Sequence, residues 1–143
     1  MAFKNGTLYI AELSQISKID NVEDKLDSSP KPTVIYSDLP KDEAHGWKFL
    51  TIGRDDRLYF NIGAPCNICM PPTNAQLRSI ATDGSDPQII ALGIRQVVGM
   101  DFNPNSKVLY FTENQRDWLS EDAPQDKLNR LLNPGKDNFG FPY

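Results

Sequence analysis

Alternating apolar and polar positions recur three times along the chain, each time around a Leu-Tyr pair. Successive pairs are 50 and then 51 residues apart. The pairs are Leu8-Tyr9, Leu58-Tyr59 and Leu109-Tyr110. In each copy an apolar residue follows the tyrosine. Because side chains alternate along a strand, this residue and the leucine lie on one face and the tyrosine lies on the other. Repeats of this length, rich in β-branched and aromatic residues, are typical of β-propeller blades.

The repeat divides the chain into three blade units, over residues 5–40, 45–94 and 95–143, within a single partial domain. Turn residues precede each Leu-Tyr pair, beginning with Asn5-Gly6. The pattern predicts an all-β fold of four-stranded antiparallel sheets, with strands at residues 7–13, 15–20, 33–38, 48–52, 57–62, 76–82, 87–92, 97–102, 107–112 and 127–132. Only the second unit contains all four strands. The first lacks its inner strand, the third lacks its outer strand, and the polar residues 21–32 are predicted to form a solvated loop.

Three blades make an incomplete ring, because propellers close with about four to eight blades. The uncovered edges and faces therefore predict self-association, and a homodimer would bring six blades together. The alternative is that the same surfaces are covered within a longer polypeptide.

Composition and charge narrow the classes of partner. The 143 residues are 39% hydrophobic, which is typical of one globular domain. A net charge of −4 with scattered Lys and Arg argues against a nucleic-acid partner. The longest apolar stretch, residues 88–94, is far shorter than the ~20 residues of a membrane helix, and no secretory signal precedes the first predicted strand. We therefore expect no membrane span, and the sequence leaves localisation open.

Several motifs, in order, resemble the sorbosone dehydrogenase-like family of soluble PQQ-dependent sugar dehydrogenases. The motifs are HGWKF at residues 45–49, GRDDRLYFNIGAPCNIC at 53–69, GIRQVVGMDFNP at 93–104, LYFTENQRDWLSEDAPQDKLNRLL at 109–132 and FGFPY at 139–143. The resemblance covers residues 44–143. It implies a six-bladed propeller that holds pyrroloquinoline quinone (PQQ) and calcium on its axis and oxidises hydroxyl or aldehyde groups of a small sugar. It also implies a periplasmic or exported setting.

The resemblance assigns roles to individual residues. His45 is the implied general base, and an imidazole with a pKa near neutral suits that task. Arg95 and Gln96 are the implied PQQ contacts, although the family has asparagine where Gln96 stands. Gln115, Arg116 and Asp117 belong to a segment, Glu113 to Asp117, that lies where the family offers backbone carbonyls and carboxylates near calcium. On the residues alone, His45 also fits a loop histidine bonded to backbone, and Arg95 fits an exposed charge at a blade edge.

Cys66 and Cys69 form a Cys-x-x-Cys motif that fits a redox pair, half of a zinc site or a disulfide-closed loop. A zinc site would need two more ligands, yet the chain has no other cysteine and a single histidine. The resemblance favours a structural disulfide in an oxidising compartment, with two free thiols as the alternative. The aromatic residues predicted to pack between blades are Trp47, Phe49, Phe102, Phe139 and Phe141, and Trp118 is the one predicted to lie toward a ligand.

Three functional hypotheses follow. The first is a quinoprotein sugar or aldehyde dehydrogenase acting as a half-propeller. The second is a non-catalytic binding or assembly module derived from that family, which is favoured by the departures at Gln96, Gln115 and Lys127. The third and weakest is a lactonase-like calcium hydrolase, for which the sequence offers no evident set of carboxylate ligands.

Overall fold

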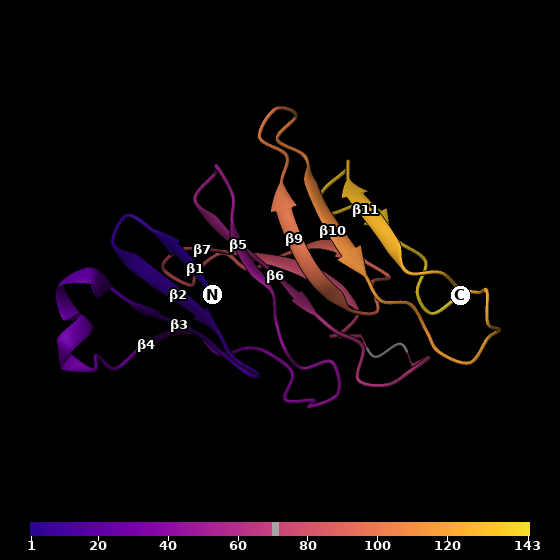
Figure 1. The fold of residues 1–143 in the computed structure, drawn as a ribbon, viewed down its shortest axis with the longest axis horizontal. Helices are drawn as coiled ribbons and strands as arrows, with labels where there is room; N and C mark the ends of the chain where they lie inside the picture. The colour runs from indigo at the N-terminus through magenta and orange to yellow at the C-terminus, as the bar shows by residue number, and fades with distance from the viewer. Residues whose placement is uncertain (70–71) are drawn as a thin grey trace.

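Three β-sheets follow one another along the chain in a computed structural model that describes residues 1–69 and 72–143 (Figure 1). The first sheet has the strand order β1 (Ala2–Lys4), β2 (Thr7–Ala11), β3 (Ile16–Ile19) and β4 (Thr33–Tyr36). The second has the order β5 (Leu50–Ile52), β6 (Arg57–Ile62), β7 (Gln76–Ala81), β8 (Gln88–Leu92) and β12 (Asp137–Asn138). The third has the order β9 (Val97–Phe102), β10 (Leu109–Glu113) and β11 (Lys127–Leu131). The fold is an all-β partial propeller, as predicted.

The first sheet differs from the prediction in two ways. It has an inner strand, β1, which the sequence interpretation left out, because Asn5-Gly6 turns the chain so that Phe3 pairs with Leu8. The predicted loop at residues 21–32 contains a 3-10 helix, η1 (Val22–Ser28), with none of its residues buried. Its polar composition was correctly interpreted as solvated, but its local helical geometry was not predicted. It is the one helix among the described residues, and it is too short and polar to cross a membrane.

The C-terminal segment leaves the third sheet and joins the second. β12 pairs in parallel with β8, Asp137 opposite Ala91, whereas all other neighbouring strands that the structure describes are antiparallel. The third sheet therefore has only three described strands, and the outer edge of the second sheet is covered. The sequence interpretation treated residues 133–143 as a loop because two paired residues leave no periodic pattern.

Each sheet has a leucine face, which carries Leu8, Leu58 or Leu109 of the repeats, and a tyrosine face, which carries Tyr9, Tyr59 or Tyr110. The sheets pack face to face, with the tyrosine face of one sheet against the leucine face of the next. Between the first and second sheets, Tyr9 and Ile16 pack against the buried Leu58 and Phe60. Between the second and third, Leu77 and Tyr59 belong to a cluster around Leu109 and Phe111. The alternation of the three repeats thus builds two apolar layers, each shared by neighbouring sheets.

Candidate functional site

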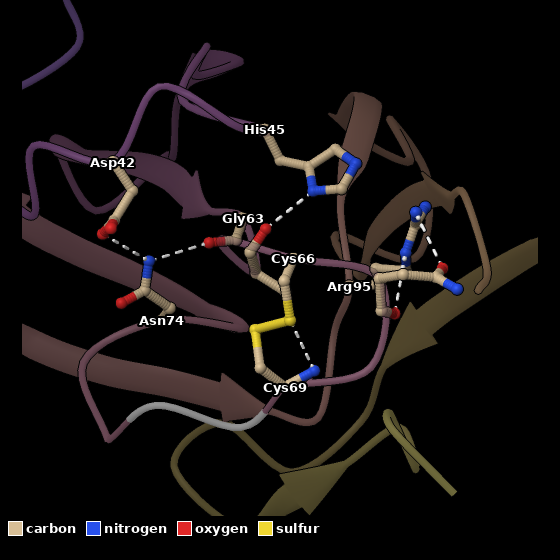
Figure 2. Close-up of a disulfide and its surroundings, with 9 residues drawn as sticks. Asp42, His45, Gly63, Cys66, Cys69, Asn74 and Arg95 are labelled. Atoms are coloured by element: carbon tan, nitrogen blue, oxygen red, sulfur yellow. Dashed lines mark hydrogen bonds between the residues drawn. A yellow bond between two sulfur atoms is a disulfide. The ribbon is translucent and has the colours of Figure 1, made fainter. Parts of the chain in front are cut away.

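The candidate site lies at the loop edge of the second and third sheets, where His45 precedes β5. The Nδ1 atom of His45 lies 2.6 Å from the Ala64 carbonyl oxygen, which follows β6 (Figure 2). A carbonyl only accepts hydrogen bonds, so Nδ1 is the donor, and in the neutral ring Nε2 carries the lone pair. The backbone bond that the sequence offered as an alternative role for His45 is thus present, and it also sets the tautomer.

Gly63 allows His45 to approach β6. A Cβ at Gly63 would lie 2.5 Å from the His45 carbonyl oxygen and 2.6 Å from the His45 Cβ, both below van der Waals contact. The backbone at His45 has φ 50°, in the left-handed region that side-chain-bearing residues rarely adopt. The residues that lead into β5, 45–49, are called the histidine loop. This loop therefore has an uncommon backbone conformation at His45, directly over Gly63.

Arg95 lies between the loops that follow β6 and β10. Its side chain bonds the Asn67 carbonyl through Nε at 3.3 Å and the Asn67 Oδ1 through Nη2 at 3.2 Å. Nη2 also pairs with Asp117 Oδ2 at 2.9 Å. Arg95 is 5% exposed, so it is a buried connector between two loops and not an exposed edge charge.

A disulfide joins Cys66 to Cys69 (Figure 2). It closes the loop that contains Asn67, the partner of Arg95. Asn67 Oδ1 also accepts from the Asp117 backbone N–H at 2.7 Å. The covalent bond leaves neither sulfur as a thiol and orders the segment that holds Arg95.

Gln96 uses both ends of its side-chain amide inside the protein. Its Oε1 accepts from Asn61 Nδ2 at 3.0 Å, and its Nε2 donates to the Trp47 carbonyl at 3.3 Å. Gln96 is 1% exposed and ties β6 to the histidine loop. Its assignment as a PQQ contact stays a prediction.

Glu113, which the sequence placed only within the segment expected near calcium, is a buried carboxylate that accepts two hydrogen bonds. Its Oε1 accepts from the Arg95 backbone N–H at 2.9 Å and its Oε2 from Asn129 Nδ2 at 2.6 Å. Burial raises the pKa of Glu113 despite these donors. A signal for this burial was available in the sequence, because Glu113 continues the inward alternation of Leu109 and Phe111 at the end of β10.

A continuous series of hydrogen bonds connects these residues. His45 donates to the Ala64 carbonyl, the Ala64 N–H donates to the Arg95 carbonyl at 2.8 Å, and the Arg95 N–H donates to Glu113. Peptide groups linked in this way polarise one another. The series positions the His45 ring relative to β10 and β11.

The predicted metal residues lie in the loop after β10. Asp117 is paired with Arg95, and the Gln115 N–H donates to Asp126 Oδ1 at 2.9 Å. Gln115 Nε2 and Arg116 Nε are buried without an acceptor in hydrogen-bond geometry among the described residues, although the Gln115 side chain lies near enough to Glu113 to oppose the rise in the pKa of that carboxyl. No group of three or more His, Cys, Asp or Glu side chains in residues 1–69 and 72–143 could hold a metal ion. The assignment of residues 115–117 to calcium stays a prediction.

The aromatic predictions divide into two groups. Phe102 and Phe139 pack against the layer between the second and third sheets, and Phe141 is buried, as predicted. Trp47 and Phe49 are 55% and 38% exposed, so the prediction that they pack between blades was wrong. They precede β5 on the histidine loop and do not alternate into a layer. The Trp47 ring lies edge-on to His45 with centroids 5.8 Å apart.

Lys48 joins the histidine loop to the first sheet. Its Nζ donates to the Leu13 carbonyl at 2.5 Å and the Gly46 carbonyl at 2.9 Å. Partial burial lowers the pKa of Lys48 to about 8. The histidine loop is thus anchored on the first sheet as well as on β6.

Comparison with known proteins finds one relative in sequence and several in structure. No protein-family model matches the chain. An uncharacterised protein of Borreliella burgdorferi is 32% identical, and the match covers 97% of this chain and 39% of that protein. The holo form of the pyranose dehydrogenase PQQ domain from Coprinopsis cinerea matches 90% of this chain with a TM-score of 0.73 and 16% identity. A glucose dehydrogenase structure matches 95% with a TM-score of 0.64 and 18% identity.

The comparisons establish the fold and its incompleteness. The chain folds like part of the PQQ domain of a sugar dehydrogenase, as the sequence resemblance implied. It spans 39% of the length of its curated relative, and 37% and 44% of the two solved structures. The described sheets therefore correspond to less than half of each matched protein.

Proposed function

We propose that the chain contributes a catalytic half-ring to a PQQ-dependent sugar or aldehyde dehydrogenase of the sorbosone dehydrogenase-like type. The observation that carries this proposal is the bond from His45 Nδ1 to Ala64, because it leaves Nε2 as the basic nitrogen. In this role Nε2 removes the proton from a sugar hydroxyl while hydride leaves the carbon that carries this hydroxyl. Figure 2 supports the geometry, since the other ring nitrogen is turned away from the bonded carbonyl.

Trp47 is the proposed contact for the sugar ring. Its indole is 55% exposed and adjoins His45. Aromatic faces offer large apolar contact area, which suits the C–H face of a pyranose. A small neutral sugar bound there would place a hydroxyl within reach of the imidazole.

The donors around Arg95 fit the carboxylates of PQQ. Arg95 supplies a buried guanidinium, and Gln115 Nε2 and Arg116 Nε are buried donors that have no acceptor in hydrogen-bond geometry among the described residues. These three side chains would hold the cofactor, which when bound supplies the hydride acceptor. The described residues contain no group of three or more His, Cys, Asp or Glu side chains that could hold a metal ion, and we assign calcium no step.

The test is reconstitution of the purified protein with PQQ and calcium, followed by dye reduction with a panel of aldoses and aldehydes. We expect His45→Gln to lower kcat by about 100-fold or more, with PQQ affinity unchanged, because a positioned base contributes about 10² to 10⁴. We expect Trp47→Ala to raise the sugar KM, whereas Leu26→Ala, at a 74% exposed position in η1, changes neither constant. Absence of PQQ binding and turnover in the wild-type protein would refute the proposal.

A second candidate is the non-catalytic binding or assembly module. This candidate is favoured because the residues implied to bind PQQ already bond to other residues of the chain. Arg95 pairs with Asp117, and both ends of the Gln96 amide are hydrogen-bonded within the chain. Calorimetric titration with PQQ separates the candidates. A folded protein that binds no PQQ supports the module, and saturable binding with sugar-dependent turnover supports the enzyme.

A further inference from the structure

The leucine face of the first sheet has the same residue pattern as two buried faces, yet none of the sheets in the described part of the chain covers it. Strand register aligns Phe3, Leu8 and Ile19 across β1, β2 and β3. The same alignment gives Ile52, Leu58 and Ile80 in the second sheet, and Phe102, Leu109 and Leu131 in the third. Leu58 and Ile80 are 0% exposed, and Leu109 and Leu131 are 2% and 6% exposed. Phe3 is 52% exposed, and Leu8 and Ile19 are only partly buried.

The tyrosine face of the third sheet shows the complementary pattern at the other end of the molecule. Ile16 and Leu77 occupy one register position in the first and second sheets, and they are 0% and 1% exposed under the following sheet. Leu128 occupies that position in the third sheet, opposite Thr112, and is 73% exposed. Val98 on β9 is also exposed, at 52%. This face is therefore built like two covered faces but lacks a following sheet in the described chain.

The two uncovered faces are complementary: the first sheet has an uncovered leucine face and the third sheet an uncovered tyrosine face. Inside the molecule, each covered tyrosine face packs on a leucine face. Ile16 on the tyrosine face of the first sheet shares a cluster with Leu58 of the second sheet, and Leu77 of the second sheet shares a cluster with Leu109 of the third. Large exposed apolar side chains at both ends make coverage favourable, because burying apolar area stabilises by about 25 cal/mol per Å².

We infer that a second copy of the chain covers both faces, the third sheet of each copy packing on the first sheet of the other. The two contacts are then identical and are related by a two-fold axis that coincides with the central axis of the ring. Together the two copies form a closed ring of six sheets. A second copy is the occupant that supplies both missing faces at once. One copy covers 37% and 44% of the lengths of the two matched structures, so two copies would span most but not all of each.

The inference rests on face packing and deepens the proposed function, because an axial site becomes complete only in a closed ring. Light scattering of the purified chain should give twice its 16.1 kDa mass. Phe3→Asp and Leu128→Asp should each weaken dimerisation by more than about 100-fold, since each change is present at both contacts. Leu26→Asp is the matched control, because Leu26 in η1 is 74% exposed, like Leu128, but lies on neither face. Circular dichroism should show β-structure and cooperative melting in all three variants.

Mixing the two variants tests the direction of pairing. A Phe3→Asp chain keeps an intact third-sheet face and a Leu128→Asp chain an intact first-sheet face, so an equimolar mixture should recover a weaker dimer through one contact. Dissociation by only one variant would indicate pairing between identical faces and overturn the ring. A monomeric wild-type protein, as expected if further sheets of a longer polypeptide cover the faces, or open-ended oligomers, would also overturn it. A dimer without turnover would refute the proposed function alone.

Discussion

The apolar layers between sheets and the polar loop edge around His45 are held together by different physics. The layers are built from side chains that alternate along strands and pack without directional constraint, such as Phe60 and Phe111. The loop edge depends on a few directional bonds that run from His45 through Ala64 and Arg95 to Glu113. A layer therefore loses stability in proportion to lost volume, whereas the edge loses geometry whenever one bonded group is removed.

The largest expected effect lies in a layer. Phe111→Ala should lower the free energy of unfolding by about 3–5 kcal/mol, because it removes a 1% exposed ring that packs edge-on against Phe139. Guanidinium denaturation measures the change. Phe49→Ala is the matched control, since Phe49 is 38% exposed and its loss should cost less than about 1 kcal/mol. Equal losses in the two variants would mean that the layers do not dominate stability.

The next effect lies at the edge. Glu113→Ala should cost about 2–3 kcal/mol, because it leaves the Arg95 N–H and the Asn129 amide without their acceptor. Glu113→Gln retains an oxygen for the Arg95 N–H, and its amide N–H can donate to Asn129 once that side-chain amide is rotated, so it should cost only about 1 kcal/mol near pH 7.

The pH dependence of stability distinguishes charge from hydrogen bonding at Glu113. Its pKa is raised by burial, so the folded state holds this proton more tightly than the unfolded state. The contribution of Glu113 to stability therefore falls as pH rises from its usual pKa of 4.5 through the raised value. Thermal melts should show that the decline is smaller in Glu113→Gln. An unchanged profile would contradict a buried charge.

Opening the disulfide should have an intermediate effect. Replacing Cys66 and Cys69 by serine should cost about 2 kcal/mol through greater freedom of the unfolded chain. It should also loosen Asn67, which lies within the closed loop and binds Arg95. Urea unfolding with and without reductant measures this change, and the double-serine variant should not respond to reductant. A reductant-sensitive variant would exclude this disulfide as the cause.

The smallest expected effect is a change in slope with pH. The pKa of Lys48 is lowered to about 8 from its usual 10.5, so the unfolded state binds the proton more tightly. Stability should therefore rise between pH 8 and pH 9.5, by about 1 kcal/mol or less because solvent screens a partly exposed ammonium. Lys48→Met should flatten this rise in melting temperature. A rise that persists in the variant would assign it to another group.

The layers could be predicted from the sequence because each depends on a repeated pattern. The Leu-Tyr alternation placed β2, β6 and β10 and the faces they bury, and a resemblance to quinoprotein motifs agreed with the propeller fold. β1 and β12 were missed since three-residue and two-residue strands carry too little periodicity. Their positions are decided by a turn and by the path of the chain after the third sheet.

The loop edge could be predicted only in part. The motifs pointed to His45, Arg95 and Gln96, and the structure places all three along one hydrogen-bonded segment. The partners of Arg95 were not predictable, because Asn67 and Asp117 lie 28 and 22 residues away and meet it only through loop conformation. Exposure of Trp47 was likewise decided by the loop path and not by its apolar character.

The return of β12 to β8 has a consequence for the order in which the molecule is completed during synthesis. Backbone bonds from Gly135, Phe139 and Phe141 reach Ile90, Leu92 and Gly93, which lie 45, 47 and 48 residues earlier in the chain. The second sheet therefore stays unfinished until the whole third sheet has emerged from the ribosome, and closing so long a loop is slow. Until then β8 remains an open edge that a neighbouring nascent chain can occupy.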